Sequence, residues 1–138
     1  MRGIEEQKLL RIIDANFNRA KEALRVCEDI CRFVLDQKTI TKRYKDVRHQ
    51  LTDSIGALKI KRLIVARNIE EDVGKATTAS ELKRKNVVDV FYANSQRAKE
   101  SVRVLEEMVK LVKPGKSVDL KDIRYTIYAL EKKIIKTF

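Results

Sequence analysis

The sequence predicts an all-α fold: an antiparallel bundle of four main helices, built from two duplicated helical hairpins that are related by a pseudo-two-fold axis. Three observations lead to this prediction. The segment NRAKEALRV at 18–26 returns almost unchanged as QRAKESVRV at 96–104. Apolar residues recur with the 3.6-residue period of a helix over long stretches. The 138 residues include one Pro and four Gly, so few residues interrupt a helix.

The repeat extends well beyond these nine residues. When 14–34 is aligned with 92–112, ten of the 21 positions are identical. The first-copy members of these pairs are Ala15, Asn16, Arg19, Ala20, Lys21, Glu22, Arg25, Val26, Glu28 and Val34. Further on, KDVRHQL at 45–51 matches KDIRYTI at 121–127. Each half, about 8–56 and about 86–137, is therefore expected to be a long helix, a short loop and a second helix, within a single domain over 1–138.

The first hairpin has a continuous apolar seam on each helix. The seam of its first helix is Ile13, Phe17, Ala20, Leu24, Cys27, Cys31 and Val34. The seam of its second helix is Ile40, Tyr44, Val47, Leu51 and Ile55. Steps of three and four residues place each set on one helix face, so both seams are expected in the core.

The segment ARNIEEDVGKATTASE at 66–81 separates the halves and is expected to be an ordered loop. Its last four residues have the pattern of a capping box, with Thr78 as the cap and Glu81 reaching back. A loop on a symmetric scaffold often carries function. A plain connector is an equally good interpretation.

The second hairpin repeats the pattern of the first. The seam of its first helix is Phe91, Ser95, Ala98, Val102, Leu105, Val109 and Val112. The seam of its second helix is Leu120, Ile123, Ile127, Leu130 and Ile134. KPG at 113–115 is expected to end the first of these helices, because Pro and Gly both interrupt a helix.

The net charge of +11 arises from 31 basic and 20 acidic residues. It fits either a solvated Lys-rich surface or a surface for an anionic partner, such as a nucleic acid or a phosphorylated small molecule. The four Phe and four Tyr form no cluster for base stacking, so a nucleic acid is the less favoured of these two anionic partners. No apolar run approaches a membrane span, and MRGIEEQKLL lacks the apolar block of a secretory signal. A cytoplasmic protein without membrane contact is expected.

Cysteine and histidine give little support for metal or redox chemistry. Cys27 and Cys31 lie on the packing seam, opposite Leu105 and Val109 in the second copy, which favours buried thiols that act as small hydrophobes. His49 corresponds to a Tyr in the second copy. DVGK at 72–75 lacks the spacing of a P-loop, so no nucleotide fingerprint is present, and no metal site is predicted with certainty.

A second seam on each long helix is interrupted by the same two polar residues, Asn16 with Arg19 and Asn94 with Arg97. An arginine that faces inward is costly unless it is paired. One interpretation is an Arg/Glu network that locks the two long helices in register. The other is a polar pocket where the helices meet, with arginines for phosphate and carboxylates for a metal or a proton.

Three stretches, 11–36, 66–111 and 123–134, resemble a helical domain that is fused to the N-terminus of some bacterial thiamine-phosphate synthases. Together they cover nearly the whole chain. That family is described as an alternative hydroxymethylpyrimidine-phosphate kinase. Its motifs fall on Asp14, Asn16, Arg19, Glu22, Arg25, Glu28, Asp29, Arg67, Asp72, Val73, Gly74, Asn94, Arg97, Glu100, Arg103, Glu106 and Glu107. Relatives often have an acidic residue where this chain has Asn68, which weakens a metal role for that position.

The resemblance implies a protein of thiamine biosynthesis that transfers a phosphoryl group from ATP to a pyrimidine monophosphate, with Mg²⁺. The implied phosphate-binding residues are Asn16, Arg19, Arg25, Arg67, Gly74, Asn94, Arg97 and Arg103, and the implied catalytic residues are Glu22, Glu100 and Asp72. The alternative is a non-catalytic helical module, without cofactors, that binds a pyrimidine phosphate or partners thiamine-phosphate synthase. A basic nucleic-acid-binding protein is the third and weakest interpretation of the function. A homodimer is a possible oligomeric state.

Overall fold

The structure, a computed structural model, describes residues 3–138 apart from the side chain of Ser80. These residues form the α-helices α1 (Gly3–Asp29), α2 (Lys38–Gly56), α3 (Ile60–Ala66), α4 (Val87–Val109) and α5 (Pro114–Ile134). A π-helical segment, Ile30–Val34, continues α1, and Ala79–Leu82 and Ile135–Thr137 are short 3-10 helices. The all-α prediction is confirmed. The described residues contain five α-helices where the sequence indicated four main ones, because α3 was not anticipated.

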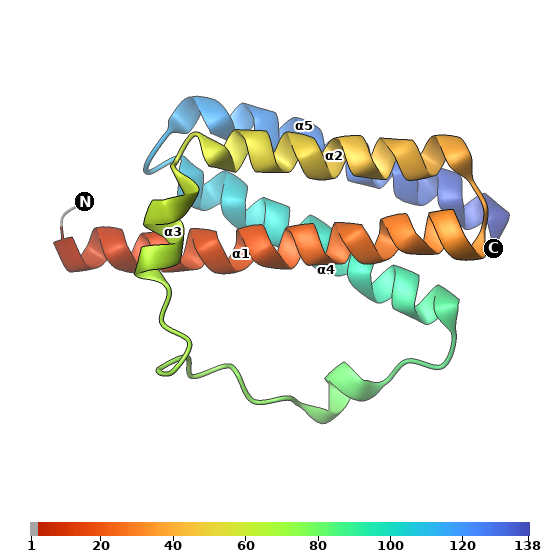
Figure 1. Ribbon diagram of the computed structural model, residues 1–138, viewed down its shortest axis with the longest axis horizontal. Coiled ribbons are helices and arrows are strands. Elements are labelled where there is room, and N and C mark those ends of the chain that lie inside the picture. Colours follow the sequence, from red (N-terminus) through yellow and green to blue (C-terminus); the bar gives the residue numbers. More distant parts are fainter. Residues whose placement is uncertain (1–2) are drawn as a thin grey trace.

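The helices α1, α2, α4 and α5 pack side by side. The two helices of each hairpin run in opposite directions: α1 is antiparallel to α2, and α4 is antiparallel to α5 (Figure 1). Both α1 and α5 pack against α2 and α4, and the most extensive contact joins α1 to α4. The short α3 packs on α1. The two helices that carry the repeated segments are therefore direct neighbours.

The predicted seams form the core. On α1, α2, α4 and α5 nearly every seam residue is buried, and Leu24, Leu51, Leu105 and Ile127 have no exposed surface. Burial of such a side chain contributes about 1.5–3 kcal/mol. Val34 is the main exception, with 54% of its surface exposed, because α1 has by then passed into its π-helical end.

The helix α4 begins at Val87, close to the start expected for the second half at about 86. The TASE segment, with the pattern of a capping box, leads into the short 3-10 helix Ala79–Leu82 and not into α4. Asn86 is the N-cap of α4, with its side-chain oxygen accepting a hydrogen bond from the backbone N–H of Asp89 at 2.9 Å. The predicted break at KPG is confirmed, since α4 ends at Val109 and Pro114 opens α5, where its missing N–H is not needed.

Each long helix carries one buried glutamate that binds an arginine on the second helix of the same hairpin. Glu28 on α1 accepts a hydrogen bond from Nε of Arg48 on α2 at 3.0 Å. Glu106 on α4 accepts hydrogen bonds from Nε and Nη2 of Arg124 on α5, the second at 3.1 Å. These bonds raise the pKa of Arg124 above its ordinary value. The interpretation that an Arg/Glu network locks α1 to α4 is therefore wrong in its placement: these ion pairs join α1 to α2 and α4 to α5.

Cys27 and Cys31 are free thiols with no exposed surface, in agreement with the prediction of buried thiols. Burial raises the pKa of Cys27 to about 12 and that of Cys31 to about 11. Because the thiolate is the reactive form, both residues are held protonated and enclosed at neutral pH.

We expect Ellman's reagent at about pH 8 to modify neither thiol in the native protein, and to modify both after unfolding in guanidinium chloride, because burial blocks access and favours the protonated form. The absorbance of the released thionitrobenzoate measures this. Rapid modification of the native protein would show that the core around α1 opens readily.

Within the described part of the chain, no helix is both long enough and apolar enough to cross a bilayer.

Candidate functional site

A cavity of about 650 Å³ lies between α1 and α4 and is called the helix cavity below. The repeated segments of the two helices form its walls. Its lining residues are Asn16, Arg19, Glu22, Ala23 and Val26 from α1, Asn94, Arg97, Glu100, Ser101 and Val104 from α4, and Glu81. Of the predicted site residues, the structure thus brings together the repeated Asn, Arg and Glu of both copies.

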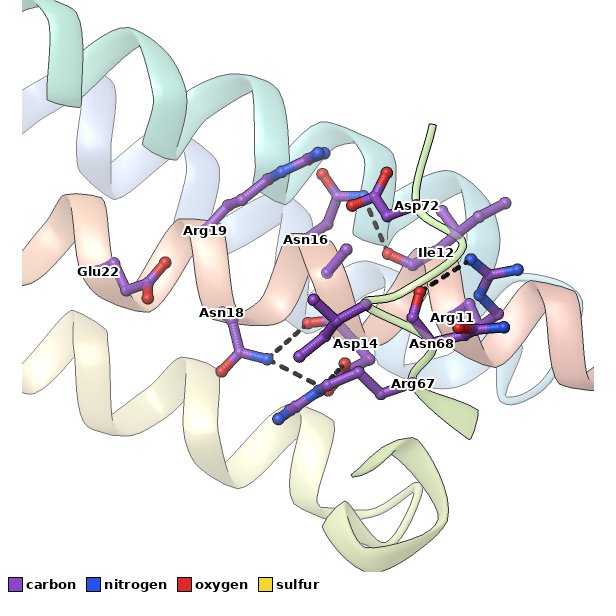
Figure 2. A pocket seen from close by; sticks show the side chains of 12 residues that line it. Arg11, Ile12, Asp14, Asn16, Asn18, Arg19, Glu22, Arg67, Asn68 and Asp72 are labelled. Carbon is purple, nitrogen blue, oxygen red and sulfur yellow. Dashed lines mark hydrogen bonds and ion pairs between the residues drawn. The ribbon is translucent and has the colours of Figure 1, made fainter. Parts of the chain in front are cut away.

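A second cavity of about 750 Å³ lies beside it and is called the connector cavity, because residues 67–86, the connector, form one of its walls (Figure 2). From α1 it is lined by Arg11, Ile12, Asp14, Ala15, Asn16, Asn18, Arg19 and Glu22, and from the connector by Arg67, Asn68, Ile69 and Asp72. Asn16, Arg19 and Glu22 line both cavities. The two cavities therefore adjoin along α1.

The two repeated asparagines adopt the same arrangement. The side-chain nitrogen of Asn16 donates to the carbonyl oxygen of Ile12 at 2.9 Å, and that of Asn94 donates to the carbonyl oxygen of Val90 at 2.8 Å. Bonding to the carbonyl four residues earlier uses the donor side of each amide. Each amide oxygen keeps its acceptor capacity and has no partner among the described residues.

The four charged residues of the repeat that line the helix cavity, Arg19, Glu22, Arg97 and Glu100, are exposed. None of them forms a hydrogen bond or an ion pair with any residue in the described range 3–138. Both arginines extend into the open cavity, as Arg19 does toward α4 in Figure 2. Solvation removes the cost of an unpaired buried charge and leaves the guanidinium donors free for a ligand.

The connector is fixed to α1 by a bidentate ion pair. The Nε and Nη2 atoms of Arg67 donate to the two carboxylate oxygens of Asp14 at 2.7 and 2.8 Å, and Asn18 also donates to Asp14 at 3.1 Å. These bonds raise the pKa of Arg67. Asp14 is 4% exposed and has Tyr92 at its place in the second copy. Arg67, predicted to bind phosphate, lines the connector cavity, and its pair with Asp14 also positions the connector.

We expect Arg67→Met to accelerate tryptic cleavage within the connector severalfold, because loss of the pair with Asp14 lets this segment open locally. Lys75, Lys83 and Arg84 are exposed or half-buried cleavage sites there. Mass spectrometry of timed digests measures the effect. Arg62→Met, which removes an exposed pair with Glu6, is the matched control and should cleave like wild type. Equal cleavage of all three proteins would show that the pair does not hold the connector.

Asp72 lines the connector cavity, whereas Gly74 lines neither cavity. The N–H of Gly74 donates to Oδ1 of Asp72 at 2.9 Å. A Cβ at Gly74 would meet only that oxygen, at an ordinary 3.6 Å. The structure thus places Asp72 at the site and gives Gly74 no part in it beyond this turn.

Arg25 and Arg103 lie outside both cavities. Arg25 pairs with Glu28 at 3.3 Å and Asp29 at 3.6 Å. Arg103 pairs with Glu106 at 3.8 Å and Glu107 at 3.4 Å. Both arginines extend the ion pairs that hold each hairpin together. Arg103 also lines a smaller cavity of about 500 Å³ beside Arg124, which is distinct from the helix cavity and the connector cavity.

Arg11, Asn18 and Glu81 are lining residues that the sequence did not indicate. Glu81 was indicated only as a residue of the capping box, and not as part of a site. Arg11 and Asn18 do carry a signal in the sequence, because they lie three residues before and four residues after Asp14 and so share its helix face.

The described residues contain no group of three or more His, Cys, Asp or Glu side chains that could hold a metal ion alone. Glu22 and Asp72 both line the connector cavity. One or two carboxylates fit the way Mg²⁺ is usually held, together with substrate phosphates and water, and do not fit a site made of protein ligands only.

A model of the ThiD2 family matches residues 11–133 of the chain. The thiamine-phosphate synthase of Synechocystis sp. is 40% identical over 124 residues, which cover 89% of this chain and 35% of the synthase. The thiamine-phosphate synthase of Rhodopirellula baltica is 37% identical over 130 residues, 94% of this chain and 35% of the synthase. That of Gloeobacter violaceus is 39% identical over 132 residues, 95% of this chain and 38% of the synthase.

The chain thus spans little more than a third of the length of these relatives. The comparison with solved structures gave no match.

Proposed function

Because the chain belongs to the ThiD2 family, we propose that it acts in thiamine biosynthesis, as a kinase that adds a second phosphoryl group to hydroxymethylpyrimidine monophosphate. The name of the relatives, thiamine-phosphate synthase, supports the pathway. The helix cavity supports the substrate class. A cytoplasmic location is part of this proposal.

One observation carries the proposal: Arg19 and Arg97, from different helices, line one cavity and neither is paired with a described residue. A guanidinium presents a fork of N–H donors that matches phosphate oxygens. The cavity volume of about 650 Å³ is in the usual range for a small-molecule site. Two free arginines on facing walls therefore suit a phosphorylated small molecule.

The reaction needs positioning more than covalent participation by the protein. An oxygen of the acceptor phosphate attacks the γ-phosphorus of a nucleoside triphosphate. The bond from that phosphorus to the β-phosphate oxygen breaks, and its electron pair leaves with the nucleoside diphosphate. Arg19 and Arg97 would hold and neutralise phosphate oxygens, and Glu22 and Glu100 would orient the acceptor. Mg²⁺, with Asp72 or Glu22 among its ligands, would neutralise the charge of the phosphates.

We also infer that the two hairpins are copies of one ancestor arranged about an approximate two-fold axis. Residues at equivalent positions make equivalent contacts. The amides of Asn16 and Asn94 bond to the fourth carbonyl before them, and the pair of Glu28 with Arg48 recurs at Glu106 and Arg124. On this view the helix cavity lies where the two copies face each other.

A second candidate function is a non-catalytic helical module that binds a pyrimidine phosphate or partners thiamine-phosphate synthase. The observation in its favour is that the matched relatives are synthases of which this chain covers about a third. Binding alone needs the arginines of the cavity and no phosphoryl donor.

We expect the purified protein, with ATP, Mg²⁺ and the pyrimidine monophosphate, to form the pyrimidine diphosphate. A coupled assay reads this out, with thiamine-phosphate synthase and its second substrate converting the product to thiamine phosphate. Omission of the protein and omission of ATP are the controls. Measurable affinity for the pyrimidine monophosphate without turnover would refute the kinase function and support the non-catalytic binding module. If the protein shows neither turnover nor this affinity, but binds duplex nucleic acid tightly and more weakly as salt rises, a nucleic-acid-binding protein would be favoured.

A further inference from the structure

From the way the two cavities adjoin, we infer that the site has two compartments that meet at Arg19: the helix cavity holds the pyrimidine monophosphate, and the connector cavity holds the nucleoside triphosphate. This inference rests on the proposed kinase function. Each cavity has the volume of one small-molecule site, about 650 and about 750 Å³. Arg19 lines both.

The helix cavity suits a small planar ring that carries one phosphate. Ala23 and Ser101, both nearly fully buried, are small residues of its lining, and Val26 and Val104 add half-buried apolar surface. A flat heterocycle can cover such a surface. The amide oxygens of the two asparagines have no described partner, and they can accept hydrogen bonds from the exocyclic amino group of an aminopyrimidine.

The connector cavity suits a larger ligand with several phosphates. Arg11 and Arg19 supply cationic groups, and Asp72 and Glu22 supply carboxylates for the Mg²⁺ that accompanies a nucleotide. Ile12 and Ile69 line the same cavity and are 41% and 64% exposed. Such exposed apolar surface beside charged groups can pack on a nucleobase while the charges bind its phosphates.

The two compartments break the symmetry of the repeat at three residue pairs: Asn16, Arg19 and Glu22 line both cavities, whereas Asn94, Arg97 and Glu100 do not line the connector cavity. The arginine pair is the one that can bind phosphate. Arg19 and Arg97 are the same residue at equivalent positions of equivalent helices. Arg97 lines only the helix cavity, whereas Arg19 also lines the connector cavity. The difference arises because residues 67–72 belong to neither copy of the repeat and lie against α1 through the pair of Arg67 with Asp14.

This asymmetry assigns the place of transfer. The phosphoryl group that leaves the nucleotide must reach the phosphate of the pyrimidine, so the two phosphates must meet at the boundary of the compartments. Asn16, Arg19 and Glu22 line both cavities and so form that boundary, and Arg19 is the cation among them. Arg19 therefore contacts both ligands, and Arg97 contacts the pyrimidine monophosphate alone.

The experiment compares Arg19→Met with Arg97→Met by titration calorimetry against two probes: the pyrimidine monophosphate, and a non-hydrolysable ATP analogue with Mg²⁺. We expect Arg97→Met to lower the affinity for the pyrimidine monophosphate at least about tenfold, as loss of a charge-assisted contact does, and to leave the affinity for the ATP analogue unchanged. Arg19→Met should lower the affinity for both probes. Because both side chains are exposed and unpaired among the described residues, both variants should melt like wild type.

Equal effects of the two variants on each probe would overturn the assignment, since repeat-equivalent arginines would then act alike. Competition between the two probes on the wild-type protein would overturn it as well. Simultaneous binding of both probes without turnover in the coupled assay would refute the kinase function and keep the two compartments. Failure of wild type to bind either probe would refute both.

Discussion

Replacement of Glu106 by leucine is expected to lower the free energy of unfolding by about 3–5 kcal/mol, the usual cost of removing one partner of a buried ion pair. Glu106 is 3% exposed, and the side chain of its partner Arg124 is 11% exposed. The substitution leaves the guanidinium on α5 enclosed and without its carboxylate. Urea unfolding followed by circular dichroism measures the change.

Two variants separate this mechanism from a general effect of leucine. Glu106→Leu with Arg124→Leu should recover most of the lost stability, because a buried pair can be replaced by apolar residues at little cost. Glu107→Leu removes only exposed pairs with Arg103 and Lys110 and should change stability little. If Glu106→Leu and Glu107→Leu cost the same, the pair with Arg124 does not hold α4 to α5.

Replacement of both Arg19 and Arg97 by methionine is expected to lower kcat/KM in the coupled assay by roughly 10²- to 10⁴-fold. Each substitution removes a charge-assisted contact with phosphate worth about 1.5–3 kcal/mol, and about 1.4 kcal/mol corresponds to a factor of ten. Methionine keeps the length and the helix propensity of the side chain, so the bundle should stay folded.

The matched control is Arg25→Met with Arg103→Met. These two arginines are also identical in the two copies, but they pair with glutamates outside the cavities. Their loss should leave kcat/KM within a few-fold of wild type. A comparable loss of turnover in both double variants would mean that the charge of the protein as a whole, and not the cavity, attracts the substrate.

Helical period alone predicted most of the core. Ile13 and Leu24 on α1, Val102 on α4 and Ile127 on α5 each belong to the apolar seam of their own helix, and all are buried. That information is local, because residues at steps of three and four share one helix face whatever lies opposite. The repeat added the long-range part: it indicated that equivalent positions on α1 and α4 belong together, and Asn16, Arg19, Asn94 and Arg97 do line one cavity.

The features that were missed depend on contacts between distant parts of the chain. The pair of Asp14 with Arg67 joins residues 53 positions apart, and nothing in the local pattern marks Arg67 as an anchor. The sequence left open whether Arg19 pairs with a glutamate or lines a pocket. It lines the cavity because its seam lies at the edge of the α1–α4 contact, where Ile12 is also 41% exposed. One signal was readable: the repeat keeps Arg48 and Arg124 as well as the glutamates that they bind.

The capping-box pattern shows a different limit. TASE has the residues of a capping box, and the chain there turns into a short 3-10 helix. The long helix begins after Asn86, whose side chain accepts a hydrogen bond from the N–H of Asp89, while the side chain of Asp89 accepts one from the N–H of Lys85. Two nearby segments thus carried start signals, and packing of α4 against α1 and α5 selects the second.

On the proposal made above, the cavity between α1 and α4 binds a pyrimidine monophosphate through Arg19 and Arg97. Calorimetric titration of that ligand into wild type, into Arg19→Met with Arg97→Met, and into Arg25→Met with Arg103→Met measures this binding. We expect saturable binding to wild type and to the control variant, and binding at least about a hundredfold weaker to the cavity variant. Equal affinity for all three proteins would contradict it.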